Sequence, residues 1–333
     1  MLSTELTRSW GLRHPIVLAP MAGVGGGELA GVVSSAGALG MIGVGSTAAP
    51  EWVAAQAALA RPHGPFGFGL MVWAVDRRPE LLDAVLAERP FALALSFGDP
   101  TPYVERARAA GVRLFSQVQD AGTARRAVEA GVDALVAQGT DAGGHTGFVG
   151  TLSLLQIVLE IGYEAGLPVL AAGGIATGRG VAGVLAMGAA GAWLGTRFAA
   201  TREALGTAEA KQAILRATER DTIHTHVFDL VQRQPWPDEF PGRALSNAFA
   251  ARWHGREEAL QAQLPEVSES FEAARARGDY REMYVYAGQA VGLIRDLPPA
   301  DELVRRLVAE AEAVLLNSRQ LLTDPDTADG EIT

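Results

Sequence analysis

One loop of the sequence combines a histidine with the backbone freedom that a ligand-binding segment needs. The loop 138–147 reads QGTDAGGHTG and carries His145 next to Gly143, Gly144 and Gly147. Glycines let a loop approach a ligand closely, because no Cβ stands in the way. An imidazole in such a loop can act as a general base, as a hydrogen-bond donor or as a cation beside an anionic substrate. We therefore predict His145 as the catalytic residue.

Two glycine-rich turns are suited to holding a phosphate group. One reads AGGI at 172–175 and the other reads GTRF at 195–198, and each follows an apolar run and precedes a helical pattern. Bare main-chain N–H groups at a helix N-terminus bind a dianion, and a threonine hydroxyl adds a further contact. The residues assigned to this site are Ala172, Gly173, Gly174, Gly195 and Thr196.

Side chains near other apolar runs suit a flat heteroaromatic ligand. Methionine packs well on such rings, although core packing explains a methionine nearly as well. Two amide side chains can form hydrogen bonds with the edge of a ring. The residues in question are Pro20, Met21 and Ala22 after the first run, Met71 near the end of the third, and Gln117 and Gln138 at the ends of the fifth and sixth.

The elements that must position these residues alternate regularly. Eight short apolar runs occur at 16–19, 41–44, 66–72, 91–96, 112–117, 134–138, 168–172 and 192–194. Helical patterns lie between and after them, at 26–36, 50–60, 79–88, 101–110, 121–130, 151–165, 178–187 and 198–204. Such alternation is typical of a parallel sheet covered by helices, and eight units favour a (β/α)8 TIM barrel of the α/β class. A doubly wound sheet is the alternative, but it would need no eighth strand.

The pattern changes after residue 206. Residues 207–285 lack strand-like runs and carry many charged and aromatic residues, including Trp236. We expect residues 1–206 to form the barrel and residues 207–285 to form a helical insertion after strand 8. This insertion would cover the active site as a lid, because chain inserted after a barrel strand projects from the catalytic face. Residues 286–323 would return to the barrel as helix, and residues 324–333 would be disordered.

Composition excludes several classes of function. The chain has 333 residues, a net charge of −10 and no cysteine, which excludes disulfides, thiolate metal sites and iron–sulfur clusters. The acidic balance argues against nucleic-acid binding, and no uninterrupted apolar stretch is long enough to span a membrane. No apolar leader follows the N-terminus, so we expect a cytoplasmic protein. His224 and His226 have a spacing that some metal sites use, but no partner ligands accompany them, and we predict no metal site.

These residues together resemble the nitronate monooxygenase family, formerly called 2-nitropropane dioxygenases, whose members are FMN-dependent barrels. The resemblance covers about residues 10–205 and 286–315. It is carried by PMAGV at 20–24, by the histidine loop at 138–147, by AAGGI at 171–175 and by GTRF at 195–198. The histidine loop is the most specific of these motifs, whereas the glycine turns occur in many flavin barrels.

The resemblance implies an FMN cofactor and a set of contacts to it. The phosphate would be held by Gly173, Gly174, Gly195 and Thr196. Main chain around Met21, with Gln117 and Gln138, would contact the flavin ring, and Gly143 would lie alongside. Met71 would also contact the ring, at a position where the family can have a polar residue instead. FMN is expected rather than FAD, because the sequence has no dinucleotide fingerprint.

The implied reaction is the oxidation of an alkyl nitronate by O₂ to a carbonyl compound and nitrite. His145 matches the active-site histidine of the family and would either take the α-proton of a neutral nitroalkane or, when protonated, stabilise the nitronate. The expected reactants are a small nitronate and O₂, and a homodimer is left open. Two alternatives remain: a flavin-dependent enoyl-acyl-carrier-protein reductase that uses NAD(P)H, and a non-catalytic barrel that binds FMN or phosphate.

Overall fold

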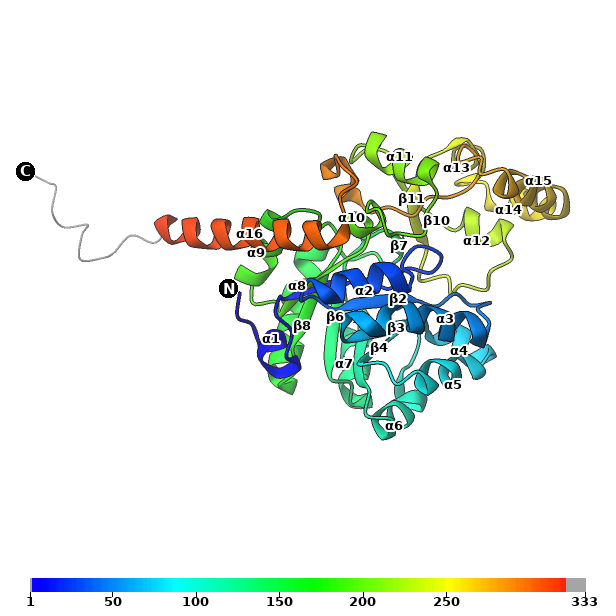
Figure 1. Ribbon diagram of the computed structural model, residues 1–333. Helices are drawn as coiled ribbons and strands as arrows, with labels where there is room; N and C mark the ends of the chain where they lie inside the picture. Colours follow the sequence, from blue (N-terminus) through cyan, green and yellow to red (C-terminus); the bar gives the residue numbers. More distant parts are fainter. Residues whose placement is uncertain (1, 322–333) are drawn as a thin grey trace, which may run out of the picture.

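The short apolar runs form the strands of a parallel barrel in the computed structural model, which describes residues 2–321 (Figure 1). The strands run in the order β1-β9-β8-β6-β5-β4-β3-β2. The last gap is bridged because Leu18 N donates to Leu39 O at 2.9 Å and Leu39 N donates to Ile16 O at 3.0 Å. The barrel strands are β1 (Ile16–Leu18), β2 (Gly40–Gly43), β3 (Phe66–Met71), β4 (Ala92–Ser96), β5 (Arg113–Val118), β6 (Ala134–Gln138), β8 (Val169–Ala172) and β9 (Gly191–Leu194). The predicted (β/α)8 barrel is confirmed.

The inside of the barrel is tightly packed at the N-terminal ends of the strands and less buried at their C-terminal ends. Val17, Phe115 and Trp193 belong to a buried cluster inside the strands. Helix α1 (Glu5–Trp10) closes the N-terminal end, where the rings of Trp10 and Phe115 lie 4.4 Å apart. At the C-terminal ends of the strands, inward positions such as Gln117 are only half-buried. This difference in burial marks the C-terminal face as the side that can receive a ligand.

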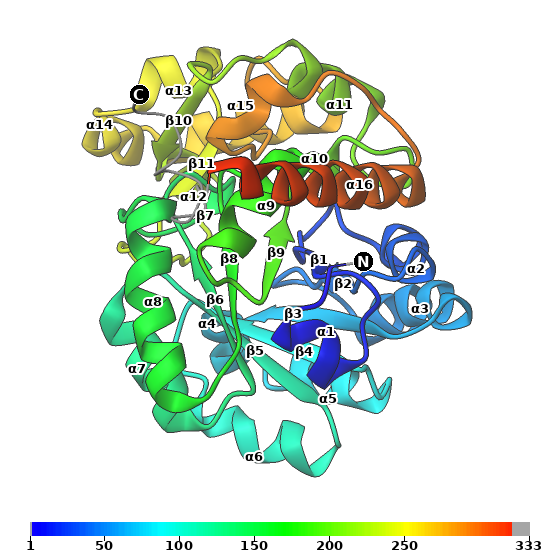
Figure 2. The ribbon, with the colours of Figure 1, turned by 90° about the vertical axis from the view of Figure 1, so that its left-hand side faces the viewer.

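Helices surround the barrel close to their predicted positions, and α16 (Ala300–Ser318) packs along α9 (Gly178–Ala186) (Figure 2). Two of them, α1 and α4, were not predicted, and α10 ends at Ala199 rather than near residue 204. Glu310 of α16 accepts a hydrogen bond from Gly178 N at 2.8 Å and so covers the start of α9. Besides α1, the helices around the barrel are α2 (Gly27–Ser35), α3 (Pro50–Ala60), α4 (Val72–Arg77), α5 (Glu80–Ala87), α6 (Thr101–Ala109), α7 (Ala121–Ala130), α8 (Thr151–Ala165), α9 (Gly178–Ala186), α10 (Thr196–Ala199) and α16 (Ala300–Ser318).

The segment 207–285 contains strands as well as helices, which corrects the expectation that it lacks them. Its strands β10 (Thr222–Thr225) and β11 (Gly242–Leu245) form an antiparallel sheet with β7 (Gly144–His145). These strands have four, four and two residues, so none of them gives a clear alternating pattern. The helices are α11 (Ala208–Arg216), α12 (Val227–Val231), α13 (Ala248–Trp253), α14 (Glu257–Ala262) and α15 (Leu264–Ala276).

This segment has its own core and meets the barrel at the ends of the strands. Its core is built around Phe228, Phe249 and Phe271. In Figure 1 the helices α12–α15 lie together at one end of the barrel. Strand β11 pairs with β7, which follows barrel strand β6. No helix among residues 2–321 is long and apolar enough to cross a membrane. The tail predicted for residues 324–333 lies outside the described part of the chain.

Candidate functional site

The main chain of His145 is fixed by two amide side chains at the top of the barrel. Gln138 ends β6, and its Nε2 donates to the carbonyl oxygen of His145 at 3.0 Å. Gln119 Nε2 in turn donates to Gln138 Oε1 at 2.9 Å. Both glutamines are buried, so these hydrogen bonds take the place of the hydrogen bonds that their amide groups would form with water. Gln138 thus positions the histidine loop, a role that the sequence did not suggest, while its predicted contact with a flavin ring stays a prediction.

The imidazole of His145 packs among residues of the segment 207–285 and against Tyr286, which directly follows it. Its Nε2 lies 2.9 Å from Asp229 Oδ1, and both side chains are 6% exposed. The ring of Trp236 stacks on the imidazole with a centroid separation of 3.4 Å and an interplanar angle of 6°. Tyr286 contributes a second ring at 5.4 Å. A hydrogen bond and a stacked ring together fix both the rotation and the plane of the imidazole.

Glycine at position 242 makes this packing possible. Gly242 pairs with His145 across β11 and β7. A Cβ at this position would lie 2.8 Å from Cε1 of Tyr286 and 3.4 Å from Nε2 of His145. The first distance is too short for a carbon–carbon contact, so any side chain here would displace the tyrosine ring. The sheet and the histidine site are therefore built together.

Electrostatic effects around the histidine keep the neighbouring tyrosine neutral. Burial, and then the nearby Asp229 carboxylate, raise the pKa of Tyr286 well above its ordinary value. Arg243 follows Gly242 in β11 and is buried, and its Nε donates to the carbonyl oxygen of Thr140 at 2.7 Å. Burial lowers the pKa of Arg243 from its usual value. This arginine ties β11 to the loop that carries His145.

An aromatic cluster connects Trp236 to two other barrel strands. Trp73 follows β3, and its ring lies 5.1 Å from that of Trp236. Phe97 follows β4 and lies 5.0 Å from Trp236 and 5.3 Å from Phe240. Trp236 therefore contacts residues beyond the C-terminal ends of β3 and β4 as well as the imidazole. Aromatic contacts of this kind bury large apolar areas and hold the loop before β11 against the barrel.

The glycine turns after β8 and β9 have room for a ligand next to them. Gly174 is exposed and has a φ of +70°. At Gly195 an added Cβ would meet only Met21 Sδ at 3.6 Å and Ala19 Cβ at 3.7 Å. Helix α10 begins directly after Gly195; Phe198 N already donates to Gly195 O at 2.8 Å, which leaves the N–H groups of Thr196 and Arg197 as the first-turn donors for a ligand. The turns thus combine accessible main chain with free donors, as a phosphate group requires.

The two turns are joined to the histidine loop through residues after 285. Gly288 N donates to Thr196 Oγ1 at 3.0 Å. A Cβ at Gly143 would lie 2.6 Å from Gly288 N and 2.7 Å from the carbonyl carbon of Ala287. Gly173, with a φ of +105°, would place a Cβ 2.7 Å from Thr151 Oγ1. Gly143 and Gly173 are therefore required by close packing of the protein itself, whatever ligand is bound.

The residues predicted to face a ring lie around the same end of the barrel. Strand register places Met71 beside Ser96 and Ser96 beside Gln117, while Gln138 lies beside Ala172. Gln117 follows Phe115 by two residues and so shares its inner side. Pro20, Met21, Met71 and Gln117 are half-buried, whereas Ala22 is exposed and Ala172 is buried. These positions fit a flat ring that rests on the barrel, and their contact with one stays a prediction.

Asp229, Tyr286 and Gln119 complete the site but were missed in the sequence. Asp229 lies inside the apolar run VFDLV of α12, where a lone acidic residue could have indicated a buried carboxylate. Tyr286 and Gln119 carry no such signal, because their roles depend on contacts with distant segments. Trp236 was recognised only as one aromatic residue of the insertion.

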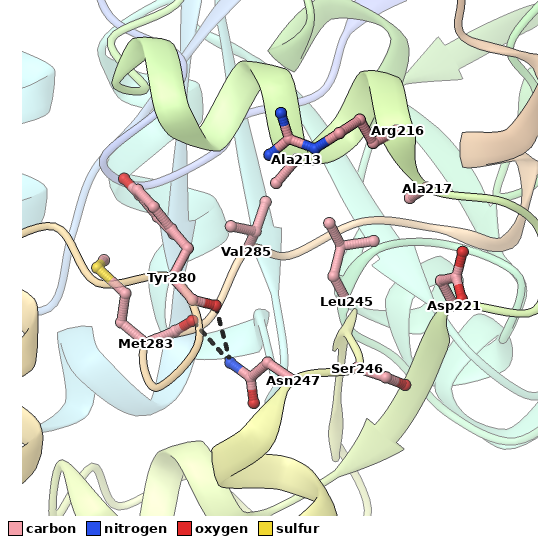
Figure 3. Close-up of a pocket in the computed structure, with 10 residues that line it drawn as sticks. All are labelled: Ala213, Arg216, Ala217, Asp221, Leu245, Ser246, Asn247, Tyr280, Met283 and Val285. Atoms are coloured by element: carbon pink, nitrogen blue, oxygen red, sulfur yellow. Dashed lines mark hydrogen bonds between the residues drawn. The ribbon is translucent and has the colours of Figure 1, made fainter.

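A pocket lies within the segment 207–285 and is separate from the histidine site (Figure 3). It has a volume of about 220 Å³ and lies between α11 and the residues around Asn247. The Nδ2 of Asn247 already donates to the carbonyl oxygens of Met283 at 2.9 Å and Tyr280 at 3.4 Å. No residue predicted for catalysis or cofactor binding lines this pocket. Among residues 2–321, no group of three or more histidine and acidic residues could hold a metal ion.

His224 is expected to make the fold sensitive to mild acid. Burial, followed by the charge of Arg243, lowers the pKa of His224 to about 4. His224 binds a proton near pH 6.5 in the unfolded chain but only near pH 4 in the folded chain. The stability that its neutral form contributes is therefore fully present above pH 6.5 and is lost as the pH falls from 6.5 to 4. After allowance for partial exposure, we expect a loss of about 1–2 kcal/mol.

Denaturant unfolding of the wild type and of His224→Gln at several pH values between 7.5 and 4 would measure this contribution. The variant should lose less stability over that range, whatever its stability at neutral pH. His63→Gln, at an exposed position, is the matched control and should follow the wild type. Equal acid sensitivity of the wild type and His224→Gln would contradict the assignment.

Comparison with known proteins finds a matching family model and relatives with a similar sequence and fold. A family model described as nitronate monooxygenase matches residues 71–310. A nitronate monooxygenase of Neurospora crassa is 32% identical, and the alignment covers 90% of this chain and 90% of the relative. FabK from Thermotoga maritima has a TM-score of 0.83 at 29% identity and covers 97% of this chain and 100% of its own. A nitroalkane oxidase from Streptomyces ansochromogenes has a TM-score of 0.77 at 31% identity, with 96% and 99% covered.

Proposed function

The chain belongs to the nitronate monooxygenase family, and from this premise we propose that it oxidises alkyl nitronates with O₂, using bound FMN, to a carbonyl compound and nitrite. The observation that carries this proposal is the position of His145. This histidine lies at the end of the barrel where the glycine turns are, with one ring nitrogen held by Asp229. That arrangement suits an acid–base group that must keep one orientation.

The protein groups around the two glycine turns fit the phosphate of FMN. Accessible main chain at Gly174 and Gly195, the start of α10 and the hydroxyl of Thr196 supply donors for a dianion. The half-buried Met71 and Gln117 would form part of the surface under the ring. FMN, when bound, supplies the electron transfer, while the protein binds and orients the substrate and controls its protons.

We further propose that neutral nitroalkanes are substrates through the basic form of His145. The imidazole would take the α-proton, so that the C–H bond breaks and its electron pair moves into the nitro group to give the nitronate. The resulting imidazolium would lie beside the Asp229 carboxylate, which stabilises the positive charge. The resemblance to a nitroalkane oxidase at 31% identity supports this branch of the proposal.

The domain arrangement that supports this function is also part of the proposal. Residues 1–206 would bind FMN, residues 207–285 would act as a lid over the active site, and residues 286–323 would return to the barrel. The contacts of Trp236 with His145 and with Trp73 support a lid that reaches the active-site face. Such a cover would exclude water from the reacting groups.

Anaerobic flavin reduction would test the proposed function directly. Purified protein loaded with FMN and mixed with ethyl nitronate without O₂ should lose the absorbance of oxidised flavin, whereas NAD(P)H should bleach it slowly or not at all. Rapid bleaching by NAD(P)H alone would favour the enoyl-acyl-carrier-protein reductase. Binding of FMN without bleaching by either reagent would favour the non-catalytic barrel.

A further inference from the structure

The contact between His145 and Asp229 joins two parts of the chain that are far apart in sequence. His145 belongs to the loop after β6, while Asp229 lies in α12 of the segment 207–285, 84 residues later. The main chain of His145 is held from the barrel by Gln138, and its side chain is held from α12 by Asp229. The orientation of the imidazole therefore depends on α12, whereas the main chain of His145 is held by Gln138 and by pairing with β11.

The carboxylate of Asp229 has few other partners. Its Oδ1 meets His145, whereas its Oδ2 is buried and forms no hydrogen bond with any described residue. A buried carboxylate with one hydrogen bond is costly unless a donor or a positive charge compensates it. The Nε2–H of His145 is the donor at hydrogen-bond distance, and the hydroxyl of Tyr286 is a second group that interacts with the carboxylate, since Asp229 helps to raise the pKa of that tyrosine. Asp229 is thus better explained by its histidine partner than by a role in packing.

The hydrogen bond also decides which nitrogen of His145 can act as a base. A carboxylate oxygen only accepts, so Nε2 must carry the proton in the neutral ring. The lone pair then lies on Nδ1, which forms no hydrogen bond with any residue in the described part of the chain. The stacked ring of Trp236 holds the imidazole plane, so the two nitrogens cannot exchange places without breaking these contacts. The arrangement leaves Nδ1 as the proton acceptor.

We propose that Asp229 is a positioning residue that holds His145 as its Nε2–H tautomer. His145 is then oriented as a base only when α12 lies against the barrel. This inference rests on the proposed function, in which His145 removes the α-proton of a neutral nitroalkane. In that step the proton passes from carbon to Nδ1, the electron pair enters the nitro group, and no oxidant is consumed. Asp229 stays ionised and faces the imidazolium that forms.

The first test compares two substrates in two variants. Asp229→Asn should reduce kcat/KM for neutral nitroethane about 10²–10³-fold, because the amide can donate to Nε2 and favour the wrong tautomer. The loss with preformed ethyl nitronate should stay below about 10-fold, since no proton has to be removed. Asp238→Asn removes the same charge at an exposed position of the same segment and should leave both rates close to the wild type.

The second test needs no turnover. Protein labelled with ¹⁵N-histidine can be studied by NMR at about pH 8.5, well above the ordinary histidine pKa, and the His145 signals can be identified by their loss in His145→Gln. In the wild type the proton should reside on Nε2, and in Asp229→Asn the Nδ1–H form should appear. Asp238→Asn should give the wild-type spectrum.

The two tests separate the inference from the proposed function. Selective loss of nitroethane turnover together with a changed tautomer would support the role of Asp229. Equal loss with both substrates and an unchanged tautomer would overturn it in favour of a purely structural role. If the wild type oxidises neither substrate, the proposed function fails. The NMR result then decides the inference alone: a changed tautomer supports it, and an unchanged one overturns it.

Discussion

His145→Ala is expected to lower the turnover of neutral nitroalkanes by about 10²–10⁴-fold, the usual effect of losing a general base. Preformed nitronates should suffer much less, because their α-proton has already been removed. The measurement is steady-state kcat/KM for nitroethane and for ethyl nitronate, with FMN content determined for each preparation. This difference between substrates follows from the position of the imidazole, which is held by Asp229 and Trp236.

The control for this experiment must separate chemistry from stability. His145→Ala leaves the buried carboxylate of Asp229 without its donor, which costs about 1–3 kcal/mol and requires a check of the unfolding midpoint. His63→Ala at an exposed position should retain wild-type rates. Equal loss with both substrates would indicate a role in anion binding or redox tuning. Wild-type rates in a variant that retains FMN would show that His145 is not catalytic.

Gly195→Leu should weaken FMN binding by at least about 100-fold. Two charge-assisted main-chain hydrogen bonds to a phosphate together contribute about 3–6 kcal/mol, and each 1.4 kcal/mol corresponds to a factor of ten. The Cβ itself would meet only ordinary contacts with Met21 and Ala19, so the protein should fold while the larger side chain occupies the space beside the turn. Fluorescence titration of the apoprotein with FMN measures the change.

The choice of position matters for this test. A side chain at Gly173 would collide with Thr151 and force a left-handed backbone, so Gly173→Leu would confuse folding with binding. Gly183→Leu is the matched control, because Gly183 is an exposed residue of α9 with no atom within 4 Å of its Cβ. Gly183→Leu should bind FMN normally. Normal FMN affinity in Gly195→Leu would contradict the phosphate assignment.

The sequence by itself determined the barrel and the succession of its strand and helix units. Each barrel unit is local, because an apolar run, a turn and an amphipathic helix lie within a few tens of residues. Their periodicity is therefore visible without any knowledge of distant contacts. The same locality identified the loop with His145 and the turns at Gly173 and Gly195, since chain that follows a parallel strand must lie at the C-terminal face.

Only the tertiary structure showed what surrounds His145. Its partners Asp229, Trp236 and Tyr286 come from segments that are distant in sequence and contact the histidine only in the folded chain. Strand β7 has two residues and exists because β11, almost a hundred residues later, pairs with it. Short strands of this kind carry no periodic signal, so the segment 207–285 was expected to be helical. The hydrogen bond that orients the imidazole is decided by packing between distant segments, which no local pattern of residues records.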